Sequence, residues 1–226
     1  MMAFLENIAN HIIEKYQKNL DNIVIVLPTK RSIVFLKKFL AKKIVKPVFL
    51  PQFFTIKQYI ESLSGLNVID NTSLQFYLYE SYLKFARKPQ NLSDFLSWSN
   101  LLLRDFNDVD TNLINPKKLF NNISNVKELE NWQVNDWSLS ENDLSDYQKK
   151  YVDFFESLYD IYTDFTSCLI NESFAFQGLA NRYASKNISN INLDYDKVLF
   201  VGLNALTESE HKIIDYLREK DIARVF

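Results

Sequence analysis

The most constraining feature of this sequence is a continuous run of β-branched and aliphatic residues, Ile-Val-Ile-Val-Leu, at positions 23–27. The run is too short for a helix and shows no alternation of polar and apolar residues, so it predicts a strand that is buried on both faces. Strands of this kind occur in parallel sheets that are covered by helices on either side. The sequence therefore predicts an α/β fold built around a parallel sheet.

Helix and strand patterns alternate around this run. Apolar residues recur at helical spacing before it, over residues 3–18, and again after it, over residues 30–43. A second short strand is expected at residues 47–50, ending at Pro51. The first quarter of the chain is thus expected to fold as α-β-α-β with short connections.

Strand patterns are then absent until Val-Leu-Phe-Val at positions 198–201, and they return once more at positions 222–226. Between them lie helix-start patterns such as Thr55-Ile56-Lys57-Gln58. A parallel α/β unit that is interrupted by a large helical segment and then resumed explains this order.

The expected domain organisation follows from these patterns. Residues 1–54 are predicted to form the first part of the α/β domain, residues 55–190 an all-helical insertion, and residues 191–226 the resumed α/β domain. Because a sheet protein seldom ends within a strand, we further expect the chain to be the front part of a longer protein.

Glycine is scarce. The sequence has three glycines, Gly65, Gly178 and Gly202, and they lie far apart. Neither GxxxxGK[ST] nor GxGxxG can be formed from them, so the usual glycine-rich loops that bind nucleotide phosphates are excluded.

The chain offers few residues for other catalytic or metal sites. Its one cysteine, Cys168, excludes an intramolecular disulfide and a multi-thiolate metal site, and we expect it to be a small buried apolar residue. Asp105, Asp108 and Asp110 lie near a helix end, and the first two share a face. No other residue nearby in the sequence could add metal ligands. We therefore expect these aspartates to cap the helix or to lie in solvent rather than to bind metal ions.

The sequence also bears on where the protein works. No apolar run approaches the roughly 20 residues that a membrane span needs, and the first residues lack the basic segment of a signal peptide. We therefore expect a cytoplasmic protein without a membrane partner.

The basic residues are concentrated in one segment. No acidic residue lies between Asp21 and Glu61, and the cations there are Lys30, Arg31, Lys37, Lys38, Lys42, Lys43, Lys46 and Lys57. Thr29-Lys30-Arg31 follows the first strand and opens a helix, so backbone N–H groups, the positive end of the helix dipole and two cations meet there. This arrangement predicts a contact with nucleic-acid phosphates. The alternative is a solvated helix face without a ligand.

Several blocks of the sequence resemble, in order and spacing, the opening of AddB-type proteins, most closely the long single chains with a C-terminal PD-(D/E)XK nuclease domain. The blocks are Val-Leu-Pro-Thr-Lys-Arg at 26–31, Pro-Val-Phe-Leu-Pro at 47–51 with the Thr55-Ile56 helix start, the segment from Trp98 to Asp110, and Phe-Val-Gly-Leu-Asn-Ala-Leu-Thr at 200–207 with Glu210.

This resemblance implies a superfamily-1 helicase-like region, in which a RecA-like (P-loop NTPase-like) parallel sheet is interrupted by a helical subdomain. It also implies contacts to single-stranded DNA from the ends of two strands, at Thr29, Lys30, Arg31 and Thr55.

The sequence departs from the ATP-binding members of that family. They carry a Walker A loop ahead of the first strand seen here, and an acidic residue for Mg²⁺ at the strand end where Val201 and Gly202 stand. We therefore expect an inactivated module that binds no cofactor and has no catalytic residue. Catalysis would belong to a nuclease domain elsewhere in the full protein.

The sequence thus predicts a non-catalytic DNA-binding and scaffold module of an AddB-like nuclease in double-strand break repair. Its expected partners are single-stranded or duplex-end DNA, an AddA-type helicase subunit and the C-terminal region of its own chain. One alternative is a protein-interaction scaffold without nucleic-acid binding, in which Trp132 and Trp137 dock a partner. Another is a nucleotide-hydrolysing enzyme, which predicts ATP binding; we expect none.

Overall fold

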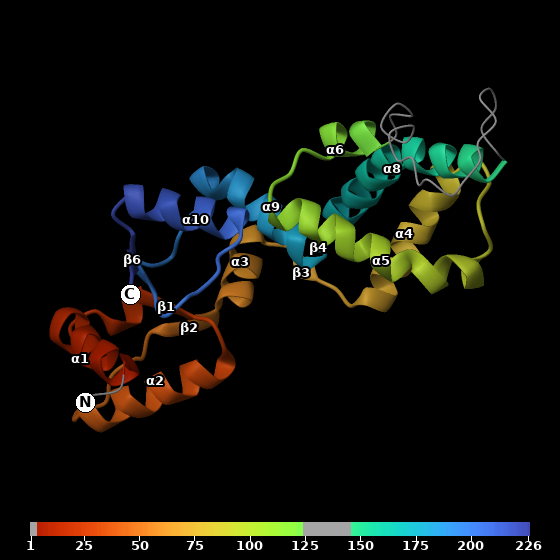
Figure 1. The fold of residues 1–226 in the computed structure, drawn as a ribbon. Helices are drawn as coiled ribbons and strands as arrows, with labels where there is room; N and C mark the ends of the chain where they lie inside the picture. Colours follow the sequence, from red (N-terminus) through yellow and green to blue (C-terminus); the bar gives the residue numbers. More distant parts are fainter. Residues whose placement is uncertain (1–3, 124–145) are drawn as a thin grey trace, which may run out of the picture. The chain divides into compact units, whose positions relative to one another are not determined.

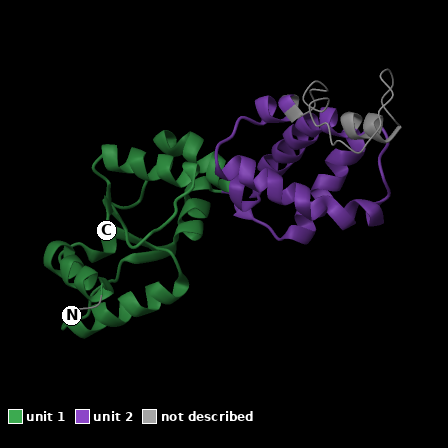
Figure 2. Cartoon of the chain, viewed as in Figure 1, with its two compact units in different colours: residues 1–65, 180–226 green, residues 66–179 purple. Residues whose placement is uncertain are grey.

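The computed structural model describes residues 4–123 and 146–226. The chain forms two compact units (Figure 2). Unit 1 comprises residues 1–65 and 180–226, and unit 2 comprises residues 66–179.

Unit 1 contains a four-stranded parallel sheet in the order β2-β1-β5-β6. The strands are β1 (Ile23–Leu27), β2 (Gln52–Thr55), β5 (Lys197–Phe200) and β6 (Ala223–Val225). Every residue of β1 is buried, as expected for a strand with neighbours on both sides and helices on both faces. This confirms the predicted α/β class with a parallel sheet.

Helices cover both faces of the sheet in unit 1 (Figure 1). They are α1 (Phe4–Tyr16), α2 (Lys30–Lys43), α3 (Ile56–Ser64), α9 (Gln177–Asn187) and α10 (Glu208–Glu219), with short 3-10 turns at Leu20–Asn22 and Ile188–Asn190. Because strand side chains alternate between faces, Ile25 packs with α1 and α2, whereas Val24 and Val26 pack with α3, α9 and α10. The sheet therefore separates two hydrophobic cores.

The second strand lies later in the chain than the sequence pattern predicts. Residues 47–50 form no strand, and Phe49 is 84% exposed; the strand is Gln52–Thr55 instead. Proline lacks a backbone N–H, so Pro47 and Pro51 weaken the ladder around the predicted segment. Phe53 and Phe54, beyond Pro51, pack into the two opposite cores and fix the register.

Unit 2 consists mainly of helices. They are α4 (Asn71–Phe85), α5 (Leu92–Thr111), α6 (Pro116–Ile123) and α8 (Asp146–Asn171). Aromatic rings fill much of its interior: the Phe106 ring meets that of Tyr162 edge-on at 5.2 Å, and Phe165 stacks on Phe176 at 5.8 Å. The insertion is not all-helical, because β3 (Asn67–Val68) pairs in parallel with β4 (Phe174–Ala175). Two-residue strands are too short to leave a sequence pattern.

The boundaries between the units differ from the expected ones at 54/55 and 190/191. Helix α3 contributes Tyr59 and Ile60 to a core of the sheet, and α9 with the turn after it contributes Ala184 and Ile188 to the same core. The boundaries therefore fall at 65/66 and 179/180. The spacing of apolar residues shows which face of a helix is buried but not which element covers it, so the sequence does not assign these two helices.

Two of the glycines occupy positions that differ strongly in the space available for a side chain. Gly178 donates its backbone N–H to Asn107 Oδ1 at 2.8 Å, and an added Cβ would lie 2.3 Å from the Asn107 carbonyl oxygen. Gly65 ends α3 in the left-handed region at φ +67°, with nothing within 4 Å of an added Cβ.

We expect Gly178→Ala to destabilise the protein by about 2–3 kcal/mol, because backbone must shift to admit the methyl group. Gly65→Ala is expected to cost about 1 kcal/mol, from backbone strain alone. Urea unfolding followed by circular dichroism measures both. Equal costs, or the reverse order, would contradict this account of the two sites.

Candidate nucleic-acid interface

Three helices of unit 1 begin at the same edge of the sheet, where the parallel strands end. We call this the carboxyl edge and define it by the strand ends Leu27, Thr55, Phe200 and Val225. Helix α2 begins just after β1, α3 directly after β2, and α10 after the loop that follows β5. Since the N-terminus of a helix is the positive end of its dipole, the starts of α2 and α3, whose first turns hold no acidic residue, favour anionic ligands. The first turn of α10, by contrast, holds Glu208 and Glu210.

Thr29 fixes the start of α2. Its Oγ1 accepts a hydrogen bond from the Ser32 backbone N–H at 3.2 Å, and Ser32 Oγ accepts one from the Thr29 N–H at 3.2 Å. Lys30 and Arg31 then occupy the first two helical positions, and both side chains are exposed. The Arg31 guanidinium lies 5.7 Å from the centre of the Phe35 ring, one turn further along.

Thr55 plays the same role for α3. Its Oγ1 donates to Gln58 Oε1 at 3.1 Å and accepts from the Gln58 N–H at 3.4 Å. Thr55 is also the residue of β2 that pairs with Leu27 of β1, so the ends of the two strands are neighbours. Lys57, in the first turn of α3, is exposed.

The structure thus brings the four residues of the predicted DNA contact to adjoining strand ends. Thr29 and Thr55 are occupied as helix caps, so their hydroxyl groups position the helix starts. Lys30 and Arg31, by contrast, extend into solvent. Lys57 was not among the predicted residues; its position two residues after Thr55, inside the acid-free segment, is the signal that identifies it.

The carboxyl edge also contains a topological switch point, where adjacent strands send their connections to opposite faces. The chain leaves β1 for α2 on one face of the sheet, and leaves β5 for α10 on the other. Open α/β sheets bind their ligands at such points. Here the strand end at β5 carries Val201, which is 1% exposed, and Gly202, with no carboxylate between them and Thr207.

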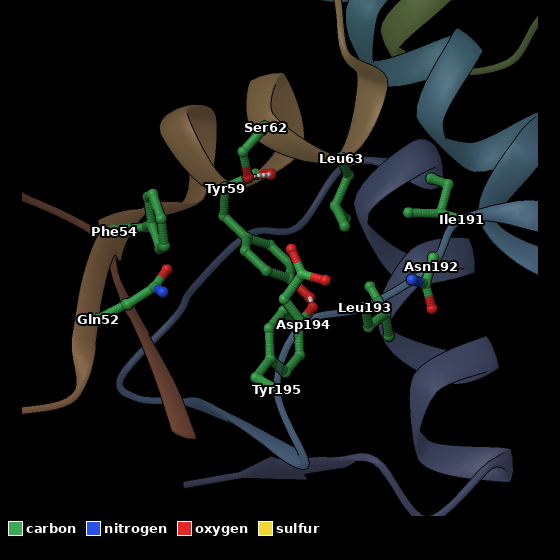
Figure 3. Close-up of a pocket in the computed structure, with 10 residues that line it drawn as sticks. All are labelled: Gln52, Phe54, Tyr59, Ser62, Leu63, Ile191, Asn192, Leu193, Asp194 and Tyr195. Atoms are coloured by element: carbon green, nitrogen blue, oxygen red, sulfur yellow. Dashed lines mark hydrogen bonds between the residues drawn. The ribbon is translucent and has the colours of Figure 1, made fainter. Parts of the chain in front are cut away.

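A pocket lies at the opposite end of the strands in unit 1 (Figure 3). Gln52 at the start of β2, residues of α3 and the segment 191–195 before β5 line it. Within it, the hydroxyl groups of Tyr59 and Tyr195 hydrogen-bond to each other. Burial raises the pKa of Tyr59 far above its usual range, and burial raises the pKa of Tyr195 to about 12. Both phenols therefore keep their protons beyond the pH at which a solvent-exposed tyrosine ionises.

The tyrosine pair predicts a loss of stability in alkaline solution. An unfolded tyrosine ionises near pH 10, whereas Tyr195 in the folded state keeps its proton until about pH 12. The folded state therefore binds more protons in this interval, and the free energy of unfolding falls as the pH rises from about 10 to 12. Urea titrations at several pH values should show a shallower fall for the Tyr59→Phe/Tyr195→Phe variant. Identical slopes would refute the assignment.

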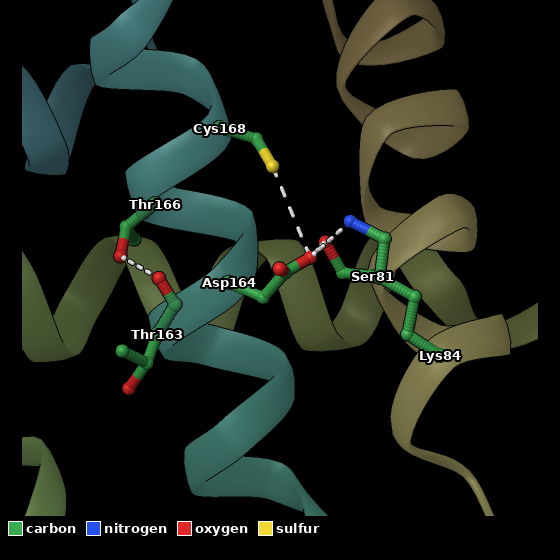
Figure 4. Close-up of polar contacts among 6 residues, drawn as sticks. All are labelled: Ser81, Lys84, Thr163, Asp164, Thr166 and Cys168. Atoms are coloured by element: carbon green, nitrogen blue, oxygen red, sulfur yellow. Dashed lines mark hydrogen bonds and ion pairs between the residues drawn. The ribbon is translucent and has the colours of Figure 1, made fainter.

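A polar cluster connects α4 and α8 in unit 2 (Figure 4). Asp164 Oδ2 accepts hydrogen bonds from Ser81 Oγ at 2.8 Å and Lys84 Nζ at 2.9 Å, and the Cys168 thiol points at it from 3.8 Å. Burial acts to raise the pKa of Asp164, but the hydrogen bonds from Lys84 and Ser81 outweigh it and the pKa is lowered.

The same cluster determines the state of the cysteine. Burial, and then the charge of Asp164, raise the pKa of the Cys168 thiol, so it stays protonated and is a poor nucleophile. Cys168 is half-buried, with a polar neighbour, rather than fully buried among apolar groups as the sequence suggests.

The three aspartates near the end of α5 are not one site. Asp110 is fully buried and accepts a hydrogen bond from the Tyr162 hydroxyl, whereas Asp105 and Asp108 are exposed. In the part of the chain that the structure describes, no group of three or more His, Cys, Asp or Glu side chains is placed to hold a metal ion.

Two further sequence expectations concern a tryptophan docking site and membrane spans. Trp132 and Trp137 lie outside the described residues. Among residues 4–123 and 146–226, no helix combines the length and the apolar character that crossing a bilayer requires.

The sequence matches no protein-family model and no curated protein. The resemblance to AddB-type proteins and the DNA contacts therefore stay predictions.

Proposed function

We propose that this chain is a non-catalytic DNA-binding and scaffold module, similar to the N-terminal helicase-like region of AddB-like nucleases, that acts in the repair of double-strand breaks. The observation that carries the proposal is the charge at the carboxyl edge. Lys30, Arg31 and Lys57 lie exposed beside two adjoining helix starts, and no acidic residue occurs between Asp21 and Glu61. Phosphate groups are the anions that suit such an edge.

The fold is compatible with a RecA-like assignment. The sheet is parallel, helices cover both faces, and the helical unit 2 is inserted between β2 and β5. The carboxyl edge, where the proposed contacts lie, is also where such sheets bind ligands.

The positions of the three glycines support a module that does not hydrolyse ATP. Gly65 ends α3, Gly178 packs against Asn107, and Gly202 follows β5, so none belongs to a phosphate-binding loop before a helix. The strand end at Val201 and Gly202 carries no acid for Mg²⁺. In this proposal the chain holds DNA and partner surfaces, including those of an AddA-type helicase subunit and of its own C-terminal region, while other residues carry out catalysis.

One observation favours the alternative, a protein-interaction scaffold. The segment before the edge strand β2 exposes apolar side chains: Val45 is 95% exposed and Phe49 is 84% exposed. Exposed apolar groups beside an unpaired strand edge are typical of protein contacts. This alternative predicts no affinity for DNA, so one binding experiment separates the two.

Replacing Lys30 and Arg31 together by alanine is expected to weaken binding of an oligothymidylate roughly tenfold, because two phosphate contacts are lost. The slope of log affinity against log salt concentration should become less steep by about 1.4, since each contact on a single strand contributes about 0.7. Fluorescence anisotropy over a range of salt concentrations measures both quantities.

Lys117→Ala/Lys118→Ala is the matched control, because it removes two exposed cations from α6 in unit 2. It should leave affinity and slope close to those of the unmodified chain. If Lys30→Ala/Arg31→Ala behaves like this control, the proposed interface is wrong.

A further inference from the structure

The outward side of α2 carries a regular pattern of cations and apolar groups. Arg31, Val34, Phe35, Lys38 and Lys42 recur at intervals of three or four residues, so they share one face of the helix. All five are exposed, with Val34 at 64% and Phe35 at 42%. We call these five residues the outer stripe.

None of the five residues of the outer stripe belongs to either hydrophobic core of unit 1. Helix α2 packs on the sheet through its other side, where Leu36 and Leu40 are fully buried. In the part of the chain that the structure describes, no side chain of α2 forms an ion pair. Instead, its cations lie against aromatic rings, as Arg31 does over Phe35 and Lys37 over Phe53 at 4.8 Å.

A second exposed ring lies beyond the far end of this helix. Because α2 connects two neighbouring parallel strands, it runs antiparallel to them, and its last turn lies at the edge where β2 begins. Phe49, three residues before β2, is 84% exposed at that edge. From Phe35, Lys38 and Lys42 follow one another along the outer stripe toward the end of the sheet at which β2 begins, over a helix about 21 Å long.

We propose that the outer stripe of α2, continued by Phe49, is a track for single-stranded DNA, and this rests on the function proposed above. Arg31, Lys38 and Lys42 pair with successive phosphates, while the rings of Phe35 and Phe49 stack on bases. Exposed aromatic rings among unpaired cations are how proteins hold a single strand irrespective of sequence. The track leads away from the carboxyl edge, so it extends the contact at Lys30 and Arg31 along the molecule.

The pattern suits a nucleic acid better than a membrane. A helix that lies in a bilayer surface needs a continuous apolar face, and the outer stripe offers only Val34 and Phe35 between its cations. An acidic protein segment would satisfy the cations, but it would not require aromatic rings at both ends of the row.

The experiment compares an oligothymidylate with an abasic strand of the same length, using the full chain. Phe35→Leu/Phe49→Leu should lose roughly tenfold or more in affinity for the oligothymidylate, because stacking on two bases is removed. Its affinity for the abasic strand and its salt dependence should not change. Phe76→Leu is the matched control, since Phe76 is 49% exposed on α4 in unit 2.

The cations of the track are tested in the same assay. Lys38→Ala/Lys42→Ala should weaken binding of both strands and make the salt slope less steep by about 1.4. Lys117→Ala/Lys118→Ala again serves as the control with the same loss of charge.

The outcomes separate this inference from the proposed function. If Lys30→Ala/Arg31→Ala weakens binding while the phenylalanine and Lys38/Lys42 variants bind like the unmodified chain, the track is wrong and the DNA contact at the carboxyl edge stands. If the unmodified chain binds neither strand, both proposals fail. Binding to vesicles of anionic phospholipid in place of DNA would overturn both as well.

Discussion

The architecture depends on one buried strand. Each residue of β1 is inaccessible to solvent, so the strand needs a hydrogen-bonded neighbour on either side and an apolar layer on either face. Strands β2 and β5 supply the first, and two separate helical cores supply the second. Parallel pairing then requires crossovers, and the crossovers bring the helix starts to one edge. The common position of the helix starts is thus a consequence of how β1 is buried, and Lys30, Arg31 and Lys57 lie at that edge because they belong to the first turns of α2 and α3.

The two points at which unit 2 is inserted into the chain both belong to elements that pack on the same sheet. The chain enters unit 2 from α3 and returns from it through α9, and both helices pack in one core on the same face of the sheet. Helices α1 and α2 pack in the core on the opposite face of the sheet. The basic helix α2 packs mainly with α1, β1 and β2, which precede the insertion in the sequence, and its core also includes Leu199 and Val201, which follow it.

The sequence predicts the parts of the fold that depend on strong local patterns. The run at 23–27 identifies the central strand, and the motifs at Thr29 and Thr55 identify two helix starts and, with them, the candidate contact. The second strand is misplaced because the apolar segment 47–50 has the composition of a strand but lies between two prolines. Burial of Asp110 beside Tyr162 depends on a contact between residues far apart in the chain, which no local pattern reports.

The outer stripe shows another limit of sequence reasoning. Helical spacing alone places Lys38 and Lys42 on the same face as Phe35, but only the structure shows that this face stays exposed to solvent. Turns are equally hard to foresee in a chain with so few glycines. Leu113, Ser173, Ala205 and Asp221 adopt positive φ angles that glycine would accept more easily, and only the surrounding structure can impose them.

The long interruption of the sheet has a consequence for how the protein reaches its fold. The central pairing of β1 with β5 joins residues 23–26 to residues 197–200, so the sheet cannot close until all of unit 2 has been synthesised. Loop-closure entropy grows only slowly with length, by about 0.6 kcal/mol for each doubling, so the insertion changes the final stability little. The insertion instead slows folding, because pairings between distant residues form late, whereas the local contacts of helices form early. During synthesis, β1 can therefore pair with β2 early, whereas its other edge has no partner until residues 197–200 of β5 have left the ribosome.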